Sequence, residues 1–244
     1  MKRLVFPLLV LLLVPSAALA QSVSVDLGEG GAGVTSRLVQ LTALVAVLSL
    51  APSLLEMVTS FTRIVIVLSL LRSALGTQGA PPNTVLIGLA LFLTFFVMQP
   101  VLDQAWTAGL LPMSEGRLNE MEGMRLAAEP FHRFMAANVR SEDLGLFVDL
   151  AHLPDPQSPD AAPWRVLIPG FLVGELRRAF EMGFLLYLPF LVIDMVVASV
   201  LMSLGMMMLP PSVVSLPFKL IFFVLVDGWR LVSGSLVQSF TDGH

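Results

Sequence analysis

The sequence predicts an all-α integral membrane protein made of interrupted hydrophobic helical hairpins and a small helical domain outside the cytoplasm. The chain has 244 residues, of which 56% are hydrophobic and only 13% are charged. Soluble domains are about 45–50% apolar and about 25% charged, so a mean hydropathy of +0.84 excludes that class. We divide the chain into regions 1–20, 21–37, 38–102, 103–163 and 164–244.

The first region, MKRLVFPLLVLLLVPSAALA, has the three parts of a secretory signal. Two basic residues precede an apolar run that is too short to cross a hydrocarbon core about 30 Å thick. The run ends in the small-x-small pattern read by signal peptidase. We expect cleavage between Ala20 and Gln21, with an uncleaved anchor as the alternative. A glycine-rich, flexible leader then occupies 21–37.

Six apolar segments follow, and several carry a proline or a charge in the middle. They are Leu38–Val58, Phe61–Leu75, Thr84–Leu102, Trp164–Gly183, Phe184–Leu209 and Ser212–Val226. Thr84–Leu102 is the cleanest span, whereas Phe61–Leu75 is too short to span alone because arginines lie at its edges. Charges and interrupted backbone at membrane depth are tolerated where they face protein or water. We therefore expect these segments to belong to a packed assembly.

Region 103–163 is acidic, with ten Asp or Glu residues and four arginines. Its pattern predicts short amphipathic helices over Ser114–Ala128, Pro130–Val139 and Ser141–His152, with Ser141 as an N-cap. Four prolines in PDPQSPDAAP then predict an extended linker. At the other end of the chain, DGWR and a short tail follow the last apolar segment.

The signal predicts that the mature chain starts outside the cytoplasm. The loop Thr59–Asn83 then lies inside, and it carries two arginines and no acid, as the positive-inside rule expects. The acidic region and the C-terminus lie outside. Arg177 and Arg178 also fall on the outer side, which conflicts with that rule and again favours segments that are not simple lipid-facing spans.

Three charged residues lie just before the second apolar segment or near its two ends. Glu56 and Arg63 are seven residues apart and share one face if a single helix contains both. They would then form a buried network that determines helix or subunit register. The alternative is that arginine extends its charged end to the membrane interface. Both interpretations stay open for Arg63, and the second is favoured for Arg72.

The stretch GELRRAFEMG combines small residues with closely spaced charges. Glu175, Arg177, Arg178 and Glu181 are spaced i,i+3 or i,i+4, so they can pair within one helix. Pairing between subunits is the alternative, because apolar residues flank the cluster. Gly170 and Gly174 form a GxxxG pattern, which permits close helix approach.

Asp194 lies deep in an apolar run, where a structural ion pair or a proton or ion site is possible. We favour the ion pair. For a hairpin turning at Pro210, Asp194 is roughly 24 Å and Lys219 roughly 14 Å from the turn. This places the two at different depths and makes Arg230 the nearer partner in depth.

Three methionines, Met206, Met207 and Met208, lie beside a helix break formed by Gly205, Pro210 and Pro211. Residues before proline avoid the helical region, so we expect the helix to end near Met208. Methionine is flexible and adapts to irregular surfaces. The run is either a deformable lining or seal, or generic core filling, and physical arguments alone leave both open.

No catalytic or cofactor pattern is recognisable. The three histidines, His132, His152 and His244, lack metal-ligand spacing, and HExxH, Walker A, GxGxxG and nucleophile-elbow motifs are missing from the sequence. Without cysteine, disulfides and thiolate chemistry are excluded. A net charge of −4 without a basic patch argues against nucleic acid as a partner. We expect a protein that is not an enzyme and holds no cofactor.

Two long blocks resemble the FliP family of flagellar biosynthetic proteins, whose relatives serve virulence type III secretion. The blocks are FTRIVIVLSLLRSALGTQGAPPNTVLIGLALFLTFFVMQPV and ELRRAFEMGFLLYLPFLVIDMVVASVLMSLGMMMLPPSVVSLPFKLIFFVLVDGWRLV. The resemblance covers nearly all of the mature chain. It implies a subunit of the flagellar export gate in the bacterial inner membrane, within the basal body.

The resemblance also implies an arrangement and a role. In that family several copies join FliQ- and FliR-like membrane subunits and other export proteins in a closed helical assembly, whose centre is the channel for unfolded export substrates. Its helices form bent hairpins, largely above the membrane plane. Its methionine-rich constriction corresponds to Met206–Met208, and its external domain, here Asp103–Pro163, contributes to subunit association. The alternatives are an assembly scaffold without a pore, and a proton-coupled transporter using Asp194.

Overall fold

A computed structural model describes residues 56–77, 79–206 and 208–241, together with scattered residues between 39 and 53. The chain divides into two units, Met1–Leu50 and Ala51–His244. The residues described in the first unit are helical. The expected cleavage site at Ala20 and Gln21, and most of the segment Leu38–Val58, lie outside the described residues.

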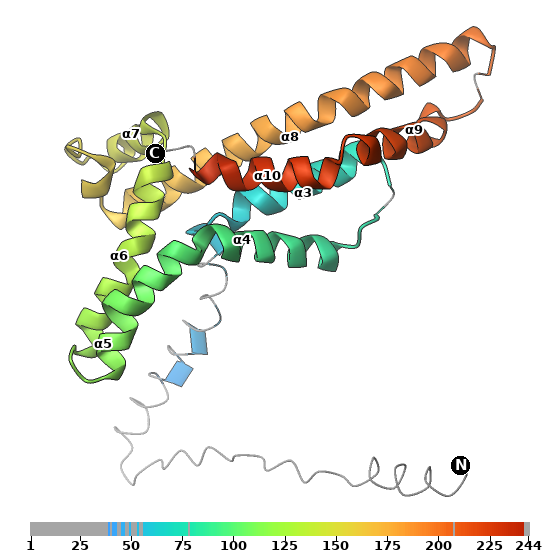
Figure 1. The fold of residues 1–244 in the computed structure, drawn as a ribbon. Coiled ribbons are helices and arrows are strands. Elements are labelled where there is room, and N and C mark those ends of the chain that lie inside the picture. The colour runs from blue at the N-terminus through green and yellow to red at the C-terminus, as the bar shows by residue number, and fades with distance from the viewer. Residues whose placement is uncertain are drawn as a thin grey trace, which may run out of the picture. The chain divides into compact units, whose positions relative to one another are not determined.

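The described part of the second unit contains helices and no strand, which confirms the predicted all-α fold. Its elements are α3 (Phe61–Leu75), α4 (Asn83–Ala105), the π-helical turn η1 (Trp106–Leu110), α5 (Leu111–Ser114), α6 (Glu120–Asn138), α7 (Ser141–Leu150), the 3-10 turn η2 (Pro159–Ala161), α8 (Trp164–Ser203), α9 (Pro211–Leu225) and α10 (Gly228–Thr241). Figure 1 shows α8 as the longest helix, with α9 and α10 returning alongside it.

Among the described residues, two continuous helical stretches are long and apolar enough to cross a membrane. They are Asn83–Ser114 and Trp164–Ser203, and α9 and α10 together make a third if the pair, bent by 63°, counts as one span. The protein is therefore embedded in a membrane. The predicted span Thr84–Leu102 is confirmed as the apolar part of the first stretch.

Several predicted boundaries are wrong because segments that were expected to be separate form single helices. Trp164–Gly183 and Phe184–Leu209 merge into one helix, α8, which continues through Pro169 and Pro189. An apolar environment favours this continuity, since unpaired backbone groups are costly there and a helix satisfies nearly all of them. Helix α6, in the acidic region, also runs through Pro130, where two helices were expected.

Two helix starts and the C-terminal tail also differ from expectation. Ser141 is the first residue of α7, and Arg140 occupies the N-cap position. Asn119, which was not predicted, caps α6 by accepting a hydrogen bond of 2.8 Å from the Glu122 amide. The expected short tail is a helix, α10. It begins at Gly228, where a Cβ would lie 2.1 Å from the Phe223 ring, so only glycine fits this bend.

The main core forms around α3, which packs against α8 and α4. One face of α3 is fully buried, and its largest apolar members are Ile64, Leu68 and Leu71. Helix α8 approaches it closely at Gly183, where a Cβ would lie 2.2 Å from Leu70 Cδ1. This packing aligns α8 along the short helix α3.

A second core joins α6, α7 and the first turns of α8, with Met135, Leu167 and Phe171 at its centre. Here the GxxxG pattern lets α7 and α8 approach each other closely, as expected. A Cβ on Gly170 would lie 3.3 Å from the Leu144 backbone, and one on Gly174 would lie 3.2 Å from Asp143 Oδ2. The two glycines let the start of α7 rest directly on α8.

A buried ion pair joins the cores. Arg63 Nε donates to Glu175 Oε2 at 2.8 Å, and Arg63 Nη2 donates to the other carboxylate oxygen. The remaining nitrogen, Nη1, donates to the carbonyl and hydroxyl oxygens of Ser239 at 3.0 and 2.8 Å. The guanidinium carbon lies 3.7 Å from the centre of the Phe240 ring. One arginine of α3 thus holds α8 and the end of α10.

The buried-network interpretation of Arg63 is correct, but its expected partner Glu56 is wrong. Helix α3 begins at Phe61, so Glu56 and Arg63 do not share a continuous helix. Glu56 is exposed, and its backbone carbonyl accepts a hydrogen bond from the Thr62 hydroxyl. Burial lowers the pKa of Arg63, and the hydrogen bond and charge of Glu175 oppose that shift. Arginine stays charged in either case.

The other charges of this region lie nearer the surface. Arg72 donates to the Asn83 side chain at 2.5 Å, linking the end of α3 to the start of α4. Arg177 pairs with Glu181 at 3.0 Å, one of the expected pairs within α8. Arg178 lies 3.9 Å from Glu175, which adds a second positive charge beside the buried carboxylate.

Replacing Arg63 by alanine should destabilise the protein strongly, because it leaves the Glu175 carboxylate buried without its main partner. We expect a loss of about 3–5 kcal/mol in the free energy of unfolding. The measurement is denaturant unfolding of the detergent-solubilised protein. Arg63→Met combined with Glu175→Leu should recover much of the loss, since it removes both buried charges.

Arg177→Ala is the matched control, because it breaks an exposed arginine–glutamate pair on the same helix as Glu175. Such pairs contribute about 0.3–0.5 kcal/mol. If Arg63→Ala cost no more than Arg177→Ala, the buried pair would not hold the core together.

Candidate functional site at the tip of the α8–α9 hairpin

The end of α8 is determined by a glycine rather than by the prolines. The helix stops at Ser203, five residues before the predicted end at Met208. Gly205 has φ 72°, a left-handed conformation that glycine adopts at little cost. The Met206 amide donates to Leu201 O at 3.0 Å, and the Gly205 amide donates to Met202 O at 3.1 Å. These two bonds form a Schellman motif, which satisfies carbonyls left free at the helix end.

The two prolines start the next helix. Pro210 is the N-cap residue of α9 and Pro211 is its first helical residue. Proline suits this position because its missing N–H is not needed there and its φ is already helical. The segment between Ser203 and Pro211 is therefore a short loop that projects the methionines from the end of a helical hairpin, at the upper right of Figure 1.

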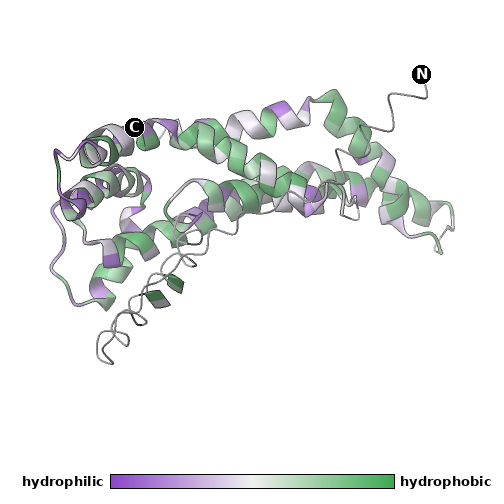
Figure 2. Ribbon diagram, turned by 90° about the horizontal axis from the view of Figure 1, so that it is seen from below, coloured by the Kyte–Doolittle hydropathy of each residue, from purple (hydrophilic) through white to green (hydrophobic). Residues whose placement is uncertain are grey.

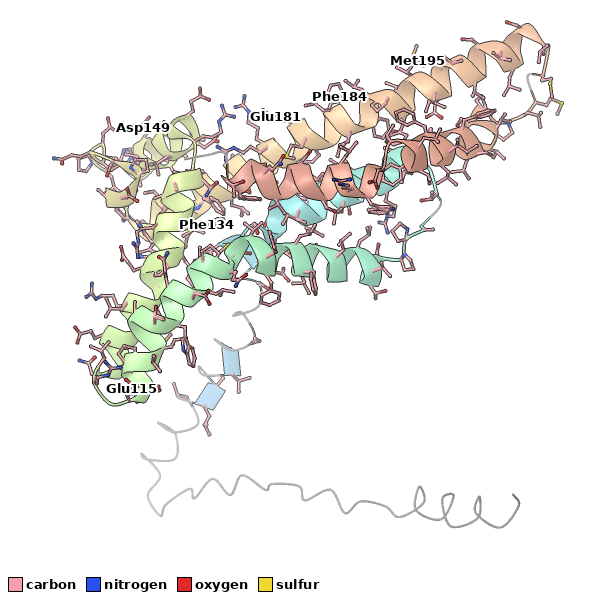
Figure 3. The ribbon with its side chains drawn as sticks, in the orientation of Figure 1. Glu115, Phe134, Asp149, Glu181, Phe184 and Met195 are labelled. Carbon is pink, nitrogen blue, oxygen red and sulfur yellow. The ribbon has the colours of Figure 1, made fainter. Side chains whose placement is uncertain are left out.

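Met206 and Met208, in this loop, are not core residues of the chain. Met206 is 43% exposed and Met208 is 99% exposed, whereas Met98 and Met135 are 1% and 0% exposed. Met207 lies outside the described residues. Sulfur atoms are visible at the tip in Figure 3. Within one subunit, Met206 and Met208 therefore do not fill a core.

A polar cluster lies behind the loop, between α8, α9 and the end of α3. Lys219 Nζ donates to Asp194 Oδ2 at 2.6 Å and to the carbonyl of Ala74 at 3.0 Å. Ser215 Oγ donates to Asp194 Oδ1 at 2.5 Å. Both carboxylate oxygens of Asp194 are thus engaged. The Lys219 charge also meets the last turn of α3, whose free carbonyls favour a cation.

The expected difference in depth between Asp194 and Lys219 is wrong. That expectation counted the whole stretch up to Pro210 as helix. Because α8 ends at Ser203 and α9 begins at Pro211, Asp194 is nine residues before one helix end and Lys219 is eight residues after the other start. The two therefore lie level. Arg230, the partner expected in depth, is exposed, and its Nη1 lies 3.9 Å from Asp227 Oδ2.

Sequence reasoning missed two partners of these charges. Ser215 is four residues before Lys219, so both lie on one face of α9, and this spacing was a usable signal. The Ser239 contact to Arg63 had no such signal, because α10 itself was not predicted. Among the histidines, His132 has a structural role, since its Nε2 lies 2.8 Å from Ala162 O and its ring packs edge-on against Trp164.

The hairpin behind the tip carries a large exposed apolar surface. On α8 this surface includes Phe180, Phe184, Leu185, Leu188, Leu191, Val192, Met195, Val196 and Val200, and on α9 it includes Val213, Phe218, Ile221, Val224 and Leu225. Figure 2 shows hydrophobic residues along most of these helices, with hydrophilic ones more frequent toward the other end of the unit. Apolar patches of this extent are covered by lipid or by protein.

No group of three or more potential metal ligands occurs in the part of the chain that the structure describes. The tip therefore presents an exposed apolar loop on a rigid support. It consists of a short loop with exposed thioethers, carried by two helices that an ion pair ties together.

Replacing Asp194 by asparagine tests whether this carboxylate is structural. The substitution removes the negative charge of the group that accepts the hydrogen bond from Lys219. We expect this to destabilise the hairpin by about 1.5–3 kcal/mol, the usual range for charged hydrogen bonds. Thermal stability and recovery of assembled complex should fall together with any loss of activity. Asp194→Asn combined with Lys219→Met should restore part of the stability.

A proton-relay role predicts a different pattern for the same variant. Asp194→Asn would then assemble normally and lose activity alone. Asp227→Asn is a suitable control, because the Asp227 side chain is exposed and its carboxylate lies at a long distance, 3.9 Å, from Arg230.

Comparison with known proteins gives the chain its family. The model of the FliP family matches residues 44–236. A flagellar biosynthetic protein FliP from Caulobacter vibrioides is 57% identical over 95% of this chain and 87% of its own length. Proteins of the same name are 47% identical over 98% of this chain in Agrobacterium fabrum, covering that relative fully, and 51% identical over 84% in Bacillus subtilis, covering 93% of that relative. The chain belongs to the FliP family of flagellar biosynthetic proteins.

Proposed function

We propose that this chain is a subunit of the flagellar protein export gate and that its α8–α9 tip lines the channel for unfolded flagellar proteins. The observation that carries the proposal is the exposure of Met206 and Met208 at the end of a helical hairpin in a family of flagellar biosynthetic proteins. Soft apolar side chains at the end of a stiff support are suited to a constriction that must close and yield.

The apolar surface of α8 and α9 supports an arrangement in several copies. A single subunit leaves this surface uncovered, so neighbouring copies and FliQ- and FliR-like membrane subunits would cover it. Copies related by rotation would place equivalent loops around one axis. The thioethers of Met206 and Met208 would then form a belt around that axis.

The proposed seal is apolar, and its action follows from hydration. An apolar constriction excludes water and thereby blocks ions, because ions cross such a site only with their hydration shell. Methionine side chains have three flexible bonds and adapt to changing shapes. They would part for a passing polypeptide and close behind it. The free energy for export would come from other components, and the exported chains would be unfolded flagellar proteins.

We place the protein in the bacterial inner membrane within the flagellar basal body, with region 103–163 in the periplasm. The predicted secretory signal supports this placement, because it would put the start of the mature chain, and with it this region, outside the cytoplasm. Region 103–163 would contribute to association between copies. Its exposed apolar residues, such as Met121 and Leu150, are available for such contacts.

A proton-coupled transporter is less well supported than a channel subunit. Both oxygens of Asp194 bind partners within the chain, and Lys219 neutralises its charge. A carboxylate held in this way serves to fasten α8 to α9.

Replacing Met206, Met207 and Met208 together by alanine should raise ion leakage through the assembled complex. Shorter side chains widen the constriction and let water in. A tenfold rise in ion flux would correspond to a barrier lowered by about 1.4 kcal/mol. The measurement is ion flux across vesicles that contain the complex with its partner subunits.

Met195→Ala is the matched control, because Met195 is also exposed in the subunit but lies on the body of α8. In complexes that assemble like the wild type, it should leave the flux unchanged. Normal assembly with unchanged flux in the triple variant would contradict a methionine seal.

A further inference from the structure

We propose that Met206 and Met208 are sites of reversible oxidation, and that their conversion to sulfoxides opens the resting channel to ions. The proposal deepens the function proposed above and rests on it. It starts from a chemical property that sealing alone does not require. Leucine fills a similar volume and would also exclude water, but only methionine carries a sulfur atom that mild oxidants attack.

Access of an oxidant to sulfur differs sharply among the methionines of this chain. Met208 is 99% exposed and Met206 is 43% exposed in the same loop, while α6 and α8 carry four further exposed methionines, Met121, Met124, Met195 and Met202. Met206 and Met208 differ from those four in lying at the proposed constriction. Met98 and Met135, in contrast, are buried in the cores. Hydrogen peroxide is a small polar molecule that approaches from water. In the proposed arrangement the loop faces the aqueous lumen on either side of the seal, so its sulfur atoms remain within reach.

The chemical step is a two-electron oxygen transfer. A lone pair of the methionine sulfur attacks one oxygen of a peroxide, the O–O bond breaks, and a sulfur–oxygen bond forms. The sulfur is oxidised by two electrons. The other peroxide oxygen leaves as hydroxide, which takes the proton from the oxygen now bound to sulfur and becomes water, so that peroxide is the only reactant added to methionine. Methionine sulfoxide reductases reverse the change with two electrons from a thiol reductant and release the oxygen as water.

The consequence for the seal follows from polarity. Sulfoxide formation turns a flexible apolar side chain into a polar one that accepts hydrogen bonds. An apolar constriction remains closed because water avoids it. Sulfoxides at the same positions would hold water in the constriction and lower the barrier to ions. In a ring of copies, each oxidised loop adds to this hydration.

The first experiment measures the chemistry directly. The assembled complex in lipid vesicles is treated with dilute hydrogen peroxide, and peptide mass spectrometry follows sulfoxide formation at each methionine. Met206 and Met208 should be oxidised at least about tenfold faster than Met98 and Met135. Equal protection of all four would overturn the proposed site, whatever the function of the loop.

The second experiment measures the effect on ion flux in the same vesicles. Peroxide should raise the flux of the wild-type complex, and methionine sulfoxide reductases A and B with a thiol reductant should lower it again. Met206→Leu combined with Met208→Leu should keep a low resting flux and lose the response to peroxide. Met195→Leu should keep the response, because its sulfur lies on the body of α8, where Figure 3 labels it.

The two experiments separate failure of this proposal from failure of the channel function. Oxidation of Met206 and Met208 without a rise in flux, in a complex whose alanine variant does leak, would overturn the opening by oxidation alone. Oxidation without a rise in flux, in a complex whose alanine variant also stays tight, would overturn the seal itself and this proposal with it. A rise in flux that persists in the double leucine variant would assign the effect to other residues.

Discussion

Arg63 and Glu175 meet in the interior of the helical unit, 112 residues apart in sequence, and three helices are arranged around their contact. A buried charge is costly unless it is paired and hydrogen-bonded. Here the guanidinium is satisfied by Glu175 on α8 and by Ser239 on α10, and Phe240 covers its face. A slip of α3 along α8 by one turn would separate the charges. The pair therefore determines how α3, α8 and α10 lie against one another.

The position of the hairpin tip depends on this alignment of the helices. From Glu175 to Ser203 is 28 residues, about 42 Å of continuous helix at 1.5 Å per residue, so α8 projects the loop far from the buried pair. A second tie, between Asp194 and Lys219, then holds α9 level with α8 and joins both to the end of α3. Two polar contacts in an apolar unit thus position a loop that itself has few constraints. This explains charges in segments that otherwise suit a membrane.

Local patterns predicted the parts of this fold that depend on neighbouring residues. The limits of α3 agree with the predicted segment Phe61–Leu75, and the apolar span of α4 agrees with Thr84–Leu102. Non-local contacts were not predictable: Glu56 looked like the partner of Arg63 because it is near in sequence, and the true partner lies on α8. The end of α8 was misjudged because the two prolines looked decisive, whereas Gly205 ends the helix five residues earlier. That difference also brings Lys219, and not Arg230, to Asp194.

The role proposed for the α8–α9 tip requires that this tip contacts the exported chain. Site-specific photo-crosslinking of an export substrate arrested in the assembled complex measures that contact, with a photoreactive residue placed at position 206 or 208 and, for comparison, at position 195. We expect crosslinks to the substrate from the two loop positions and none from position 195. Crosslinks from partner subunits alone, with none from 206 or 208, would contradict this role and would favour a scaffold without a pore of its own.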